Sequence, residues 1–168
     1  LFRQELSMTD SIRKRLLSLL EQRILFLDGA MGSLLQQHAL TERDFRGERF
    51  KDHPCDLKGC NDLLCLTQPA IIEQIHLDYL TAGANIIETN SFNANPTSLD
   101  EYQLGYLTRE INRASAQIAR QSIASLPKDQ QPDRFVAGIL GPTTRSLLTP
   151  CSASDPALRN ITFDELVA

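Results

Sequence analysis

Hydrophobic positions recur along this chain in two spacings, which predict alternating helices and strands. Between residues 10 and 21 the apolar side chains fall at helical intervals, with arginines and a lysine on the other faces, so an N-terminal amphipathic helix is predicted. A continuous apolar run follows at 24–27 and ends at Asp28 and Gly29. Such a run is typical of a strand that is buried on both faces of a parallel sheet.

The same alternation resumes after a long polar segment, residues 29–66. This segment exceeds an ordinary connection between a strand and a helix, and loops of such length are usually functional. A helix is predicted from about Thr67, with Pro69 in its first turn and Gly83 at its end. The pattern then predicts a strand at 85–89, a helix at 107–126 and a third strand at 135–140.

A last helix is predicted to begin close to the final residue. Thr162 and Glu165 have the Thr-x-x-Glu spacing of a capping box, which marks a helix N-terminus. Strands that alternate with helices through right-handed crossovers form either the start of a (β/α)8 barrel or a doubly wound sheet. The hydrophobic pattern alone leaves both architectures open.

Composition and charge narrow the class of protein. The 168 residues suffice for one domain, and 42% hydrophobic with 23% charged residues is typical of a soluble globular protein. No apolar run approaches the roughly 18 residues of a membrane span. The N-terminus lacks a signal-peptide core, so a cytoplasmic protein is expected. The net charge of -4, without a basic stripe, argues against nucleic acid and membrane surfaces as partners.

The cysteines and histidines predict neither a metal site nor a catalytic residue. Cys55, Cys60, Cys65 and Cys151 contain no Cys-x-x-Cys pair, and no histidine completes a zinc-finger spacing. Because nothing suggests export, we expect reduced thiols without an assigned role. His76 lies mid-helix and is predicted to be a surface or packing residue.

Polar clusters follow each of the three predicted strands, where ligands bind in barrels and doubly wound sheets alike. After the first strand, the Asp28 carboxylate suits an ammonium group and the backbone around Gly32 and Ser33 suits a carboxylate, a pairing that fits an amino acid. An Asp-Gly turn explains the same residues. A second cluster, at 88–93, also lies where a site would require it, but from the residues alone it is better explained as caps of the following turn.

The third cluster follows residue 140. Gly141 permits a close backbone approach to a ligand, and Thr143 offers a hydroxyl group. A rigid turn between strand and loop explains these two residues equally well.

Taken together and in order, these segments resemble the homocysteine-binding module of cobalamin-dependent methionine synthase. Related thiol methyltransferases that use betaine or S-methylmethionine share the barrel and the Asp-Gly strand end. The FRGERF segment and the DLKG-x-NDLL pattern in the long first loop resemble the cobalamin type. The matching segments are LDGAMGSLLQ (27–36), FRGERF (45–50), DLKGCNDLLCLTQPAIIEQIH (56–76), YLTAGANIIETNSFNAN (79–95), FVAGILGPTTR (135–145) and DPALRNITFDELVA (155–168).

The resemblance implies an α/β fold, the N-terminal portion of a (β/α)8 TIM barrel with about three strands. Residues 1–23 are expected to form a helical leader and residues 24–168 the first βα units. In the family, zinc on three cysteine thiolates holds the homocysteine sulfur, which attacks methylcobalamin carried on another domain, and methyltetrahydrofolate recharges the cobalamin. No position here matches the zinc cysteines, so the fragment alone is expected to be inactive.

The resemblance also implies which residues of this chain bind the amino and carboxylate groups of homocysteine. Asp28 is expected to face the ammonium group of homocysteine, and the carboxylate to lie near four residues: Gly32, Ser33, Gly141 and Thr143. Two alternatives remain, a short homocysteine- or amino-acid-binding or assembly module without catalysis, and a betaine-type homocysteine methyltransferase. An unpaired strand edge also predicts self-association.

Overall fold

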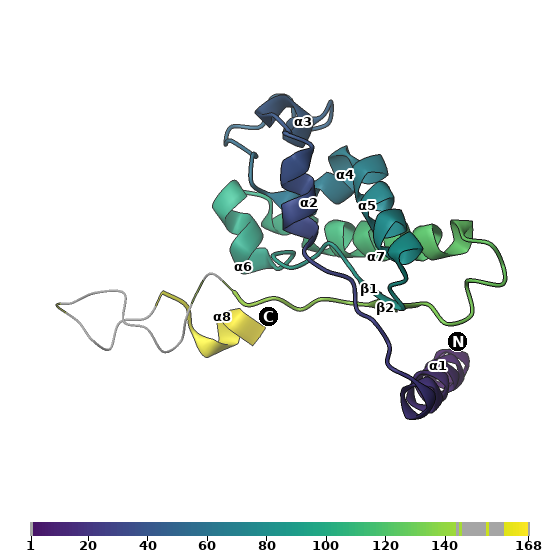
Figure 1. The fold of residues 1–168 in the computed structure, drawn as a ribbon. Helices are drawn as coiled ribbons and strands as arrows, with labels where there is room; N and C mark the ends of the chain where they lie inside the picture. Colours follow the sequence, from purple (N-terminus) through teal and green to yellow (C-terminus); the bar gives the residue numbers. More distant parts are fainter. Residues whose placement is uncertain (1, 144, 146–153, 155–159, 168) are drawn as a thin grey trace.

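The computed structural model describes residues 2–143, 145, 154 and 160–167 (Figure 1). Helices cover a small parallel sheet. The elements in chain order are α1 (Phe2–Gln22), α2 (Met31–Gln37), α3 (Glu42–Arg46), η1 (Asn61–Leu63), α4 (Leu64–Thr67), α5 (Pro69–Ala82), β1 (Ile86–Glu88), α6 (Pro96–Leu99), η2 (Asp100–Tyr102), η3 (Gly105–Leu107), α7 (Thr108–Ser125), β2 (Phe135–Ala137) and α8 (Phe163–Val167).

The sheet brings together three parallel segments in the order of the sequence. β1 pairs with β2, with Ile86 opposite Phe135. On the other side of β1, Leu27 forms a parallel bridge with Ile86, and the Asp28 amide donates to the Ile86 carbonyl at 2.9 Å. α5 and α7 pack against each other on one side of the strands, whereas α1 lies on the opposite side (Figure 1). The carboxyl ends of all three segments therefore meet at one edge.

The helices that flank β1 are those that the hydrophobic pattern predicts. α5 begins at Pro69, whose missing amide hydrogen costs nothing in a first turn. It ends at Gly83, whose φ of +111° is left-handed and favours glycine. α7 buries Ile111, Ile118 and Ala119. These contacts place a hydrophobic core between α5 and α7, above the strands.

The prediction of an irregular loop at 29–66 is wrong. The segment folds into α2, α3, η1 and α4, and its apolar residues join the main core: Leu35, Phe45, Phe50, Leu57, Leu63 and Leu64 are all buried. Its helices are too short to show a clear period, which is why the sequence pattern did not predict them. α3 even carries a capping box, in which Asp44 accepts hydrogen bonds from the backbone and the hydroxyl of Thr41.

The first strand is also less regular than predicted. Positions 24–27 are extended beside β1, but only the bridge at Leu27 is formed, and Ile24 and Phe26 are 78% and 64% exposed. The expectation of burial on both faces is therefore wrong for the described part of the chain. The segment is held beside β1 through the Phe26 carbonyl, which accepts from the Asn85 and Ile86 amides, while the side chains of Ile24, Phe26 and Leu27 stay exposed.

The remaining predictions concern the ends of the chain and the cysteines. α1 confirms the N-terminal helix and begins earlier than predicted, and the Thr162–Glu165 capping box of α8 is formed. Cys55, Cys60 and Cys65 are free thiols, and Cys151 lies outside the described residues. Among the helices that the structure describes, none is long and apolar enough to cross a membrane.

Candidate functional site at the carboxyl ends of the strands

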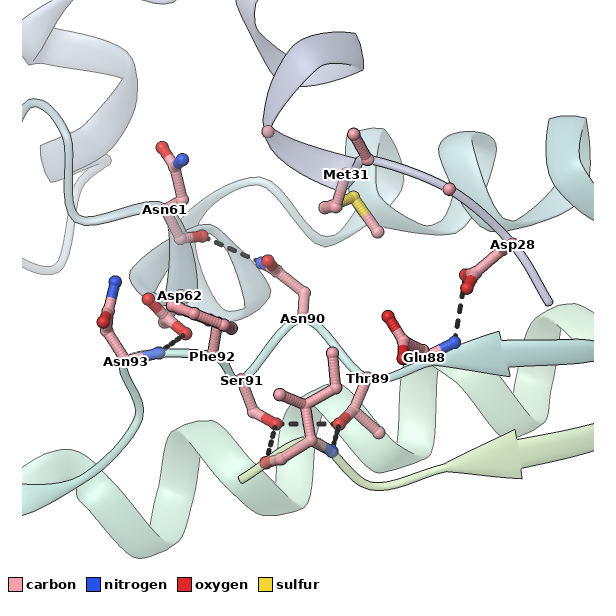
Figure 2. Close-up of a pocket in the computed structure, with 14 residues that line it drawn as sticks. Asp28, Met31, Asn61, Asp62, Glu88, Thr89, Asn90, Ser91, Phe92 and Asn93 are labelled. Atoms are coloured by element: carbon pink, nitrogen blue, oxygen red, sulfur yellow. Dashed lines mark hydrogen bonds between the residues drawn. The ribbon is translucent and has the colours of Figure 1, made fainter. Parts of the chain in front are cut away.

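A cleft of about 420 Å³ opens where the three parallel segments end (Figure 2). The turn that follows the first segment forms one side of the cleft. The residues that follow β1 form its floor, and η1 closes the far side. Its lining side chains include Asp28, Met31, Asn61, Asp62, Glu88, Thr89, Asn90, Ser91, Phe92, Asn93 and Ile139.

Asp28 stands at the acidic end of this cleft. Its Oδ2 accepts a hydrogen bond from the Glu88 amide at 3.0 Å, whereas its Oδ1 is buried without a partner among the described residues. Burial raises the pKa of Asp28 to about 6; the Glu88 amide lowers it, and the charge of Glu88 adds to the rise. Asp28 and Glu88 are half-buried neighbours, and neither forms an ion pair within the described residues. This arrangement favours a cationic ligand, because an ammonium would both neutralise and hydrogen-bond Asp28.

The end of β1 is fixed by a network of buried hydroxyl groups. The hydroxyl oxygens of Thr89 and Ser91 lie 2.7 Å apart and share a hydrogen bond. The Ile139 amide donates to the Thr89 hydroxyl at 3.0 Å, and the Ser91 hydroxyl donates to the Ile139 carbonyl at 3.3 Å. These bonds tie the residues after β2 to the residues after β1, so the floor of the cleft is a single rigid surface.

η1 supplies the opposite wall. The Asp62 carboxylate accepts a hydrogen bond from the Asn93 amide at 3.0 Å, and the Asn90 side chain donates to the Asn61 carbonyl at 2.9 Å. Asp62 is only 3% exposed, and burial raises its pKa. Asn61 and Asp62 are not among the site residues predicted from the sequence, where they occur only within the matching segment 56–76. No local signal marks them, because their partners lie about 30 residues away.

The cleft also has an apolar portion. Met31, Phe92 and Ile139 line it together with the polar groups, and Figure 2 shows Met31 above the Asn90–Ser91 backbone. Phe92 is 52% exposed although it is aromatic. An acidic end beside an apolar patch suits a small amphipathic molecule with an amine at one end.

Comparisons with known proteins agree with this chemistry. The sequence model of the homocysteine S-methyltransferase family matches residues 25–168, which is most of the chain. The chain belongs to the homocysteine S-methyltransferase family. Its fold is similar to two crystal structures of the homocysteine methyltransferase MmuM from Escherichia coli. The oxidized form shares 26% identity over 76% of this chain with a TM-score of 0.58. The metallated form shares 25% identity over 76% of this chain with a TM-score of 0.57.

These similar structures indicate the architecture of the chain. Its α/β fold, with a small parallel sheet, is similar to the TIM-barrel fold of the homocysteine methyltransferases. The chain spans 41% of the length of either MmuM chain. In such barrels the active site lies at the carboxyl ends of the strands, which is where the cleft is found.

Of the five predicted homocysteine-binding residues, two line the cleft and three do not. Asp28 and Gly32 line it directly. Ser33 is exposed on α2 and does not line the cleft. Gly141 packs against the backbone of Phe92 so closely that a Cβ would collide with the Phe92 carbonyl. The Thr143 hydroxyl donates to the Arg145 carbonyl at 2.7 Å.

The described residues of this family member do not fit a zinc ion. No group of three histidine, cysteine or acidic side chains comes together in the described ranges. Burial raises the pKa of Cys60 to about 12 and that of Cys65 to about 11, so both remain thiols at neutral pH and are poor metal ligands. We therefore assign no metal-dependent step to these residues.

Proposed function

We propose that this chain binds the amino-acid end of homocysteine, as part of an enzyme that methylates the homocysteine thiolate to give methionine. One observation carries the proposal: Asp28 lines a cleft in a homocysteine S-methyltransferase fold, and its buried Oδ1 has no hydrogen-bond partner among the described residues. An ammonium group at this atom would satisfy it and lower the pKa of Asp28 toward its ordinary range.

The residues of this chain would bind and orient the substrate. Asp28 receives the ammonium group, with Glu88 beside it. The backbone near Gly32 lies on the same cleft, within reach of the substrate carboxylate. The apolar surface of Met31 and Phe92 would contact the methylene groups. These contacts fix the direction of the thiol, which is the contribution that a binding site makes to a transfer reaction.

We further propose that the methyl donor is methylcobalamin, and that zinc and the cobalamin- and methyltetrahydrofolate-binding domains belong to the longer enzyme. The support is the resemblance of FRGERF and DLKG-x-NDLL in the first loop to the cobalamin type. In this proposal the chain represents about three of eight barrel strands and is inactive alone. A betaine-type enzyme is the second candidate, because the similar solved structures are homocysteine methyltransferases of the MmuM kind.

Isothermal titration calorimetry with L-homocysteine tests the binding proposal. Asp28→Asn should weaken binding on the order of tenfold, the value of a hydrogen bond to a charged group. Asp129→Asn makes the same chemical change on the exposed connection between α7 and β2, and should have no effect. 4-Mercaptobutanoate lacks only the amino group of homocysteine, so its affinity should be insensitive to Asp28→Asn. Equal loss for both ligands would contradict the assignment.

A second experiment separates the two donors. The natural gene product that contains this chain is supplied with zinc and homocysteine, and with methylcobalamin, betaine or S-methylmethionine in separate reactions. Methionine formed from methylcobalamin supports the first candidate. Methionine formed only from betaine or S-methylmethionine would assign the chain to the betaine-type group.

A further inference from the structure

The FRGERF segment (45–50) lies outside the cleft, yet most of its residues make specific contacts. Phe45 and Phe50 are buried in the core. Gly47 has a φ of +52° and packs on Thr67, where a Cβ would lie 3.4 Å from the threonine side chain. Arg49 forms a bidentate ion pair with Glu110 on α7. Glu48 is exposed and makes no polar contact within the described part of the segment, so it is a natural control.

Arg46 is the centre of this arrangement. Its Nη1 donates to the His53 carbonyl at 2.5 Å and its Nη2 to the Cys55 carbonyl at 2.8 Å. Its Nε lies 2.6 Å from Glu42 Oε1, one helical turn earlier on α3. The side chain is only 17% exposed. A planar guanidinium can donate hydrogen bonds in these fixed directions at the same time, whereas a lysine ammonium cannot.

Glu42 extends the same arrangement to the next residues. Its carboxylate accepts hydrogen bonds from the Leu57 amide at 2.8 Å and from the Lys58 amide at 2.6 Å. Desolvation would raise the pKa of Glu42, but these amides and Arg46 outweigh it and hold the pKa below its ordinary value. Together Glu42 and Arg46 bind the backbone at residues 53, 55, 57 and 58. We call these two side chains the α3 clamp.

The clamped backbone leads directly into the wall of the cleft. The Cys60 amide donates to the Leu57 carbonyl at 3.0 Å and closes a tight turn, in which Gly59 has a left-handed φ of +102°. Asn61 and Asp62 follow at once and bind the backbone and side chains after β1. Only Gly59 and Cys60 separate the last clamped residue from Asn61, so the chain has little slack to absorb a displacement.

We propose that Glu42 and Arg46 are positioning residues, which hold the 53–58 backbone and thereby fix Asn61 and Asp62 against the end of β1. The inference assigns the FRGERF segment and the preceding α3 turn to the shape of the cleft. Its effect on homocysteine rests on the proposed function, whereas its effect on the cleft wall does not. The test therefore includes readouts that need no ligand.

The thiol of Cys60 reports on the turn. Cys60 is 3% exposed and its pKa is raised to about 12 by burial, so it resists alkylation in the folded protein. Cys65 is equally buried, but α4 holds it, and it serves as the internal reference. With iodoacetamide and peptide mass spectrometry, Glu42→Gln and Arg46→Lys should raise the labelling rate of Cys60 relative to Cys65 about tenfold. Glu48→Gln should leave the ratio unchanged.

The amide of Asn93 reports on the cleft wall, because it donates to Asp62. Hydrogen exchange at Asn93 should accelerate in Glu42→Gln and Arg46→Lys and stay unchanged in Glu48→Gln. Homocysteine affinity, measured by calorimetry, should fall in the same two variants on the order of tenfold. Neither clamp residue lines the cleft, so this loss would reflect position and not contact.

Three results would overturn the inference. Unchanged Cys60 labelling would show that the α3 clamp does not hold the turn. Equal acceleration at Cys60 and Cys65 would show that it stabilises the whole domain instead. Faster Cys60 labelling with unchanged Asn93 exchange would show that the turn and the cleft wall are independent. If the unmodified chain fails to bind homocysteine, the proposed function fails, while the two ligand-free readouts still decide the role of the α3 clamp.

Discussion

At the scale of single residues, Asp28 combines a cost in stability with its proposed role in binding. Its folded-state pKa of about 6 lies above the ordinary 3.8. The folded protein therefore holds the proton more tightly, so the associated stability is present below about pH 3.8 and is lost as pH rises through 6. Asp28→Asn should raise the melting temperature at pH 7.5, while the difference shrinks toward pH 4. A lower melting temperature for the variant at pH 7.5 would contradict this.

His76 gives the opposite pH dependence. It is fully buried on α5, both ring nitrogens lack a partner among the described residues, and burial lowers its pKa to about 4. The unfolded chain accepts a proton below about pH 6.5, so stability falls between pH 6.5 and 4, by about 3 kcal/mol at most. His76→Leu should remove this dependence, because it keeps the bulk without the nitrogens. Urea unfolding at pH 7.5 and at pH 5 gives the free energy of unfolding of the unmodified chain and of His76→Leu. The same loss of stability between the two pH values in both proteins would refute the prediction.

How far such residues are predictable depends on the distance to their partners. Asp28 could be found from the sequence because a strand end followed by glycine is a local signal. His76 could be placed as a surface or packing residue only, since burial depends on how α7 packs on α5. Asp62 could not be found at all, because its partner Asn93 is 31 residues away. The cleft therefore combines residues that a local sequence signal marks with residues that only tertiary contacts bring together.

At the scale of elements, the segment after β2 depends on a close approach that only glycine allows. A Cβ at Gly141 would collide with the Phe92 carbonyl, whereas nothing lies within 4 Å of a Cβ at Gly138. Gly141→Ala should therefore displace the segment and break the bond from the Ile139 amide to Thr89, and Gly138→Ala should not. Hydrogen exchange at Ile139 measures the effect. Slow exchange retained in both variants would show that the contact is dispensable.

The elements also show where pattern reasoning stops. α5 and α7 are long enough for a helical period to emerge, and their predicted ends agree with the structure to within about two residues. α2, α3 and α4 have 7, 5 and 4 residues, too few for a period, and each of them contributes buried residues to the core. Long-range contacts therefore shape the first loop, which carries one wall of the cleft.

At the scale of the whole molecule, the two sides of the sheet differ. α5 and α7 cover one side, while α1 lies on the opposite side (Figure 1). Arg15 on α1 and Arg23 just after it both pair with Asp133, which precedes β2. Apolar side chains of the first segment and of α1 stay exposed within the described residues: Ile24, Phe26 and Leu27 in the segment, and Ile12 and Leu20 on α1. An apolar surface of this kind next to a strand paired on one side recruits other chains.

This surface predicts self-association of the isolated chain at micromolar concentration. Phe26 is the best site to test, because only its backbone makes hydrogen bonds and its side chain is 64% exposed. Phe26→Lys should leave the fold intact and shift sedimentation velocity profiles toward monomer, since a charge at a strand edge opposes pairing. Tyr106→Lys removes an equally exposed aromatic on η3 and should not change association. If the unmodified chain is monomeric, the predicted associating surface does not exist. If both variants have equal effects, the associating surface lies elsewhere.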